Sequence, residues 1–165
     1  MSNTFDISNK PKFIGSITKR ELKKYVTSWG WSRLIEGGKG EFVEEIILDY
    51  LINIKKYSNI VKSKPNCSHD FHLLNEEDIR IDVRRFNSKD SMYLGYTSSM
   101  KKSRKNWQDK AKYLKRGGYF GAHINNKEIN LYYLPAKFLL KNFYTDRLSI
   151  DLTLSWTLTD LIKKK

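Results

Sequence analysis

The stretch from Cys67 to Phe86 constrains the fold more than any other part of the chain. It contains two short apolar runs, residues 70–74 and 79–84, joined by a polar turn. Two such runs separated by turn-forming residues predict a β-hairpin. The chain is therefore expected to build a β-sheet around this hairpin.

The second run of the hairpin alternates strictly between apolar and charged residues. Successive side chains of a strand point to opposite faces, so one face would carry Ile79, Ile81 and Val83. The other face would carry Arg80, Asp82 and Arg84. A solvated face would explain this alternation without any functional role.

A second acid is expected beside Asp82, because Asp70 opens the neighbouring strand of the hairpin. Two carboxylates held together repel each other, which is costly unless a cation lies between them. Mg²⁺ favours such oxygen ligands and completes its octahedron with waters and a substrate phosphate. Asp70 and Asp82 therefore form a predicted site for Mg²⁺, with Mn²⁺ as a substitute.

An acid at the start of one strand, followed by an acid-x-base triplet on the next, resembles the core of the PD-(D/E)xK nuclease superfamily. Asp70 matches the first acid, and Asp82-Val83-Arg84 matches the triplet. The resemblance covers the middle of the chain, from Gly40 to about Leu134. It implies a restriction-endonuclease-like fold and a metal-dependent hydrolysis of phosphodiester bonds.

Members of this superfamily also carry an acid on a helix before the hairpin, often after a glycine. Residues 40 to about 55 predict an amphipathic helix, since apolar residues recur there every three or four positions. The resemblance places Glu44 at the acid position of this helix and makes it a third candidate metal ligand. Glu41 and Glu45 are the alternatives if the helix is turned differently.

The chain departs from the superfamily pattern at two positions. His69 stands where the name-giving proline would be, and Arg84 stands where lysine is usual. Lysine can orient or deprotonate an attacking water, whereas arginine stays protonated and supplies only charge and hydrogen bonds. Three alternatives follow: the metal alone activates the water, another lysine takes the missing place, or the site binds without cutting.

Positive charge dominates the composition. The 31 Lys and Arg residues exceed the 18 Asp and Glu residues, for a net charge of +13. Such an excess attracts polyanions, of which nucleic acid is the commonest. Basic residues concentrate between positions 101 and 116, where Asp109 is the only acid, and they predict an amphipathic helix with a phosphate-binding face. The expected nucleic-acid contacts are Lys39, Lys101, Lys102, Arg104, Lys105, Lys112 and Arg116.

The length of 165 residues suits one domain with a real core and is too short for two ordinary ones. We expect a single α/β domain with a mixed central β-sheet flanked by helices. Residues 1–16 would form an N-terminal arm, residues 40–134 the nuclease core, and residues 159–165 a basic tail. Residues 119–124 and 129–134 predict a further pair of strands.

One cysteine, Cys67, excludes an intrachain disulfide and any four-cysteine metal site. The first residues lack the pattern of a secretory signal, and no apolar run approaches the length of a membrane span. A cytoplasmic protein without a membrane partner is the expectation.

Together, the residues and the resemblance predict a Mg²⁺-dependent DNA endonuclease of the restriction, homing or junction-resolving type. The predicted catalytic residues are Glu44, Asp70, Asp82 and Arg84. RNA is not excluded as a substrate, and a homodimer is expected because cutting both strands of a duplex needs two sites. The alternatives are a non-catalytic basic module that binds DNA or RNA, and a basic subunit of a larger assembly.

Overall fold

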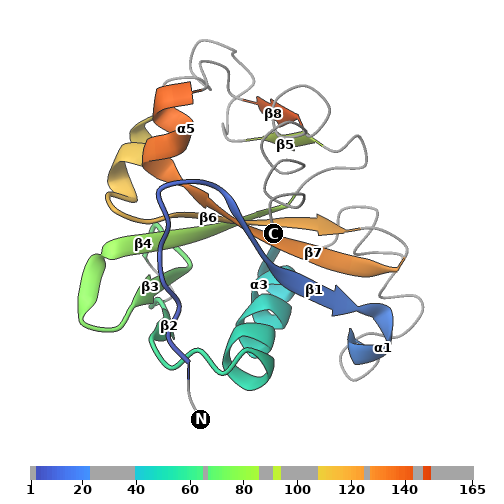
Figure 1. Cartoon of the computed structure of the whole chain (residues 1–165). Coiled ribbons are helices and arrows are strands. Elements are labelled where there is room, and N and C mark those ends of the chain that lie inside the picture. The colour runs from blue at the N-terminus through green and yellow to red at the C-terminus, as the bar shows by residue number, and fades with distance from the viewer. Residues whose placement is uncertain are drawn as a thin grey trace.

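The computed structural model describes residues 3–22, 40–64, 67–85, 91–93, 108–124, 127–142 and 147–149. Within these residues the chain forms a mixed α/β domain around a curled six-stranded sheet (Figure 1). The strand order is β1-β7-β6-β4-β3-β2. Strands β4 and β6 run parallel, and every other neighbouring pair in this sheet is antiparallel. The predicted mixed central sheet is confirmed.

The elements follow one another along the chain as β1 (Lys12–Thr18), α1 (Lys19–Leu22), α3 (Gly40–Asp49), η1 (Tyr50–Ile54), β2 (Ile60–Lys62), β3 (Phe71–Leu73), β4 (Glu76–Arg85), β5 (Ser91–Tyr93), β6 (Gly118–Ile124), β7 (Glu128–Pro135), α5 (Ala136–Asn142) and β8 (Arg147–Ser149). Residues 108–113 form a further short helix before β6. The short strands β5 and β8 pair with each other in a separate two-stranded sheet.

The predicted hairpin is present as β3 and β4, with Phe71 opposite Ile81. Asn75 makes the turn between them with a positive φ of 64°, a conformation that asparagine tolerates better than most residues. The hairpin occupies one half of the six-stranded sheet, and the predicted strand pair β6 and β7 lies directly beside it. Because β4 is parallel to β6, the chain between them must cross over one face of the sheet.

The sheet is covered by apolar side chains on both faces. On one face, α3 packs against the sheet, with Val43 and Ile47 beside Ile79 and Ile81 of β4. On the other face, a smaller cluster joins Leu114 and α5 to strands β6 and β7. The predicted apolar face of β4 is therefore confirmed. Its charged face, however, also lies under cover, because the helix of residues 108–113 contacts it.

The N-terminal segment departs from the expected arm. Strand β1 pairs with β7, and Phe5 is only 2% exposed in the core. Asn59 holds Phe5 in place: its side chain accepts a hydrogen bond from Phe5 N at 2.8 Å and donates one to Phe5 O at 2.9 Å. The prediction of an N-terminal arm over residues 1–16 was therefore wrong for Phe5, which is buried, and for residues 12–16, which lie in β1. A lone phenylalanine among polar residues gave little signal, although its burial stabilises the whole segment.

The helices begin where the sequence pattern indicates. Thr18 caps α1, since its hydroxyl oxygen accepts a hydrogen bond from Glu21 N at 3.2 Å. Helix α3 continues into η1, a π-helical turn in which Lys55 N donates to Tyr50 O at 2.9 Å. Residues 159–165, the predicted basic tail, lie outside the described residues.

Candidate active site

The hairpin register places the two predicted acids opposite each other. Phe71 pairs with Ile81, and one further step along both strands brings Asp70 level with Asp82. The backbone supports this step, because Asp70 N donates a hydrogen bond to Ile81 O at 3.1 Å. The side chain of Asp70 is held as well, since its Oδ2 accepts a hydrogen bond from Val83 N at 2.7 Å.

The carboxyl groups of Asp70 and Asp82 lie on neighbouring strands at the same level, close enough for Asp70 to affect the titration of Asp82. Asp82 is only 6% exposed. Burial, the hydrogen bond to Asp70 and the charge of Asp70 together raise the pKa of Asp82 to about 7, while the charges of Lys110 and Arg84 oppose this rise. The expected close approach of the two acids is confirmed; their role as metal ligands stays a prediction.

Two cations flank Asp82 on its covered face. Arg84 Nη2 lies 3.4 Å from Asp82 Oδ2, and Lys110 Nζ lies 3.6 Å from the same oxygen. Lys110 also donates a hydrogen bond to the carbonyl of Ser68, just before Asp70. The buried carboxyl of Asp82 is therefore bordered by two positive charges, one from its own strand and one from the helix of residues 108–113.

Tyr113 fastens this helix to the hairpin. Its carbonyl accepts a hydrogen bond from Arg80 Nη1 at 2.8 Å, and the Arg80 guanidinium lies 4.3 Å from the centre of its ring. Its hydroxyl lies 2.9 Å from His69 Nδ1. Burial, followed by the charge of Arg80, lowers the pKa of His69, so this ring is neutral at pH 7. These contacts hold Lys110, one turn earlier, over Asp82.

A cleft of about 230 Å³ opens beside the acid pair. Asp70 and His69 line it from the hairpin, and Glu44 and Glu45 line it from α3. Lys62 and Lys64 contribute positive charge to the same cleft. Glu44 thus lines the same cleft as Asp70, as the resemblance implied, and Glu45 lines it too. The side chain of Glu41 lies outside the described residues.

Among the described residues, no three histidine, cysteine or acidic side chains converge closely enough to hold a metal ion. Glu44 therefore lines the cleft without completing a three-residue ligand group with Asp70 and Asp82. The structure brings together the two acids of the hairpin, and it leaves the helix acid at the edge of the site.

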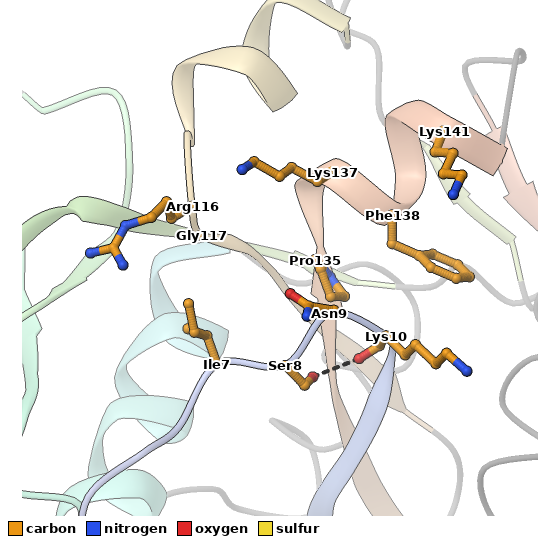
Figure 2. A pocket seen from close by; sticks show the side chains of 10 residues that line it. All are labelled: Ile7, Ser8, Asn9, Lys10, Arg116, Gly117, Pro135, Lys137, Phe138 and Lys141. Carbon is orange, nitrogen blue, oxygen red and sulfur yellow. Dashed lines mark hydrogen bonds between the residues drawn. The ribbon is translucent and has the colours of Figure 1, made fainter.

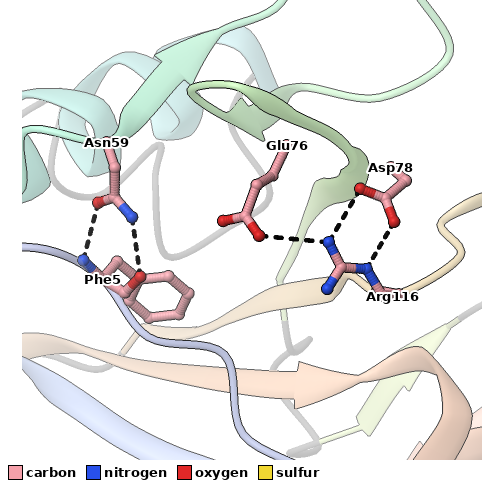
Figure 3. A network of polar contacts seen from close by, with 5 residues as sticks. All are labelled: Phe5, Asn59, Glu76, Asp78 and Arg116. Atoms are coloured by element: carbon pink, nitrogen blue, oxygen red, sulfur yellow. Dashed lines mark hydrogen bonds and ion pairs between the residues drawn. The ribbon is translucent and has the colours of Figure 1, made fainter.

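The predicted nucleic-acid contacts have different outcomes. Lys112 is exposed on the helix of residues 108–113. Arg116 is also exposed, but Asp78 and Glu76 pair with it, at 2.5 Å and 3.3 Å (Figure 3). Its charge is thus partly neutralised within the protein. The remaining predicted contacts lie outside the described residues: Lys39, Lys101, Lys102, Arg104 and Lys105.

Lys110 is the site residue that the sequence pattern missed. It lies four positions before Leu114, which is fully buried, so both side chains fall on the face of the helix turned to the sheet. That spacing is present in the sequence. The site role of Lys110 is nevertheless hard to recognise there, because the basic residues around it favour a solvent-exposed face.

Comparisons with profiles of known protein families, with curated proteins and with solved structures find no match for this chain. Of the helices that the structure describes, none is both long and apolar enough to span a membrane.

Proposed function

We propose that this protein is a metal-dependent nuclease whose reactive centre is formed by Asp70 and Asp82. The observation that carries the proposal is the placement of these two carboxyls opposite each other on neighbouring strands, with Asp82 only 6% exposed. Burial and mutual repulsion both make such a contact costly in free energy. A function that requires two adjacent carboxylates accounts for a cost that structural stability alone does not.

The donor set fits Mg²⁺ or Mn²⁺. Both side chains offer hard oxygen ligands, and one or two protein carboxylates suffice where waters and substrate phosphates complete the coordination. When bound, the metal would lower the pKa of a water and stabilise charge on the leaving oxygen. Asp70 is oriented by its hydrogen bond from Val83 N. Glu44 lines the adjoining cleft, where its carboxylate can accept hydrogen bonds from water.

Lys110 supplies the lysine that position 84 lacks. Its ammonium lies 3.6 Å from Asp82 Oδ2, close enough to orient a water or a phosphate oxygen beside the acid pair. Arg84 stays protonated and stabilises the negative charge that develops on the phosphate in the transition state. Of the three alternatives left by the sequence, the structure favours a lysine that arrives from another element.

Nucleic acid is the substrate that suits a net charge of +13. The described elements follow one another as a helix with Glu44, the acid-bearing hairpin, a short helix with Lys110 and a strand pair. We infer a DNA endonuclease of the restriction, homing or junction-resolving type. A homodimer and a cytoplasmic location remain predictions.

A metal-dependent cleavage assay tests the proposal. Supercoiled plasmid, branched DNA and single-stranded RNA are each incubated with Mg²⁺, with Mn²⁺ or with EDTA. We expect cleavage of at least one substrate that needs the metal and is lost in Asp82→Asn and Asp70→Asn. If the wild type cuts none of them while circular dichroism shows it folded, the proposal fails.

The role of Lys110 has its own test in the same assay. Lys110→Gln keeps a polar side chain, one atom shorter, but removes its charge, so we expect the cleavage rate to fall at least about 10²-fold. Lys115→Gln makes the same change on an exposed residue outside the site and serves as the control. Equal cleavage rates for Lys110→Gln and Lys115→Gln would indicate that the metal alone activates the water.

A specific observation favours a second function, a non-catalytic nucleic-acid-binding module. Arg84 and Lys110 both lie within ion-pair distance of Asp82, and these cations balance the acid pair without any metal. Such a module would bind nucleic acid equally well with Mg²⁺ and with EDTA. The binding and cleavage assays together therefore separate the two functions.

A further inference from the structure

A second cleft shares no lining residue with the candidate active site. Its volume is about 630 Å³, and it lies where the N-terminal segment passes the start of β6 and the first turns of α5 (Figure 2). Its walls come from residues 7–10, from residues 116–117 and from residues 135–141. Three segments far apart in the sequence thus build one concave surface.

Charge of a single sign lines this cleft. Its basic residues are Lys10, Arg116, Lys137 and Lys141, and none of its ten lining residues is acidic. A concave surface that carries one sign of charge concentrates its field and attracts ions of the opposite sign. In the view of Figure 2, Arg116 and Lys137 lie toward one end, and Lys10 and Lys141 toward the other. The cleft therefore suits an extended anion with several charges.

Arg116 is the most firmly held of these cations. Asp78 accepts hydrogen bonds from both Nε and Nη2 of Arg116, at 2.5 Å and 3.1 Å. This bidentate contact fixes the plane of the guanidinium, although it offsets part of its charge. Arg116 thus contributes orientation to the cleft, and the three lysines contribute most of its charge.

The middle of the cleft is apolar. In Figure 2, Pro135 lies near the middle of the cleft, and the half-buried ring of Phe138 lies between Lys10 and Lys141. Cations that track a phosphate backbone, combined with an aromatic ring on which a base can stack, are the features of single-strand binding surfaces. A volume of this size is typical of pockets for small ligands and admits a few nucleotides. A duplex is too broad for this cleft, since its major groove alone is about 12 Å wide.

We propose that this cleft binds an unpaired strand of the nucleic acid, with a base against Phe138 and phosphates on the lysines. The identity of the ligand rests on the proposed nuclease function. The two sites are connected by a short piece of chain: Arg116 follows Lys110 by six positions, a span of at most about 22 Å. That distance corresponds to roughly six nucleotide steps of a strand. One strand can therefore reach both sites, and junctions or ends with unpaired nucleotides become the favoured substrates.

Fluorescence anisotropy in EDTA tests this inference without cleavage. The probe is a labelled 12-nucleotide single strand, compared with a blunt duplex of the same sequence over a salt series. We expect tighter binding of the single strand. In Lys137→Gln/Lys141→Gln, the slope of log K against log salt should become shallower by about 1.4, since each phosphate contact contributes about 0.7 for single strands.

Two further variants sharpen the test. Phe138→Leu keeps an apolar side chain but removes the stacking surface, and we expect at least about a five-fold loss in single-strand affinity with an unchanged salt slope. Lys56→Gln/Lys127→Gln removes two exposed lysines outside the cleft and should leave the slope as in the wild type. Urea unfolding of each variant confirms that it is folded before binding is compared.

The inference is overturned if Lys137→Gln/Lys141→Gln and the control Lys56→Gln/Lys127→Gln have the same salt slope. It is also overturned if Lys137→Gln/Lys141→Gln weakens the binding of single strand and of duplex equally. Loss of binding only for free nucleotides would show a small-molecule anion site and would equally overturn it. Failure of the nuclease proposal looks different: no substrate is cut with any metal, while the salt slope still responds to Lys137 and Lys141.

Discussion

Asp82 is the residue in which the conflict between stability and function is most visible. It lies on a central strand, is 6% exposed and stands opposite a second acid, Asp70. With a pKa of about 7, it holds a proton over much of the range in which an ordinary aspartate is ionised. That proton allows the two carboxyls to remain in contact, since a fully ionised pair would repel.

The raised pKa predicts how stability depends on pH in the absence of metal. Asp82 has an ordinary pKa of 3.8 when unfolded and about 7 when folded, so folding takes up a proton between these values. The free energy of unfolding therefore falls as pH rises through this window, by up to about 1.4 kcal/mol per pH unit, and levels off above pH 7. Urea unfolding in EDTA at several pH values measures this slope.

Asp82→Asn is the variant that isolates this effect. Its amide does not titrate and can still hydrogen-bond to Asp70, so the fall in stability with pH should be largely lost. Asp109→Asn, on the exposed surface of the helix of residues 108–113, is the matched control and should keep the slope of the wild type. A slope that persists unchanged in Asp82→Asn would assign the titration to another group.

At the scale of the elements, the N-terminal segment is joined to the sheet through Asn59. Its side chain makes two hydrogen bonds to the backbone of Phe5 (Figure 3). We expect Asn59→Ala to lower the free energy of unfolding by about 1–3 kcal/mol, because the backbone groups of Phe5 lose their partner. Asn53→Ala, an exposed asparagine on η1, should change it by less than about 0.5 kcal/mol. Equal effects would mean that the segment contributes little to stability.

The crossover into β6 depends on Gly117. A Cβ at this position would collide with the carbonyl oxygen of Arg80 in β4. Gly117→Ala should therefore push β6 away from β4 and cost about 1–3 kcal/mol of stability, as overpacking commonly does. Thermal unfolding checks this, with the exposed Lys112→Ala as the control. We expect Gly117→Ala to slow cleavage as well. Arg80 also holds Tyr113, so a shift of Arg80 would displace Lys110.

At the scale of the whole molecule, the sheet and the acid pair were predictable because both follow from local patterns. The alternation of Ile79 and Ile81 determines the buried face of β4, and a hairpin determines which residue stands opposite Asp82. Lys110 and the burial of Phe5 were not predictable in this way. Each depends on a contact between segments far apart in the sequence. The spacing of Lys110 and Leu114 indicates the helix face on which Lys110 lies, but neither the partner of that face nor the packing of a lone aromatic is encoded locally.

Metal binding should stabilise the entire domain if the two acids are ligands. A ligand that binds only the folded state adds about 2.7 kcal/mol of stability at one hundred times its Kd. We expect Mg²⁺ or Mn²⁺ at pH 7.5 to raise the melting temperature of the wild type. Asp70→Asn and Asp82→Asn should lose this increase. KCl at the same ionic strength serves as a control for general ionic effects, and an equal rise in all three proteins with Mg²⁺ or Mn²⁺ would show that the metal binds elsewhere.

The position of Lys110 on the crossover also has a consequence for how the chain is made. The two acids lie within a single hairpin, whereas Lys110 follows Asp82 by 28 residues. At ordinary rates of synthesis it leaves the ribosome roughly 1.5 to 6 s later. During that interval the acids of a nascent hairpin have only neighbouring cations such as Arg84 to offset them. Strand β6 begins eight positions after Lys110 and pairs with β4, so we expect the second cation to reach the acids only once β6 has been made.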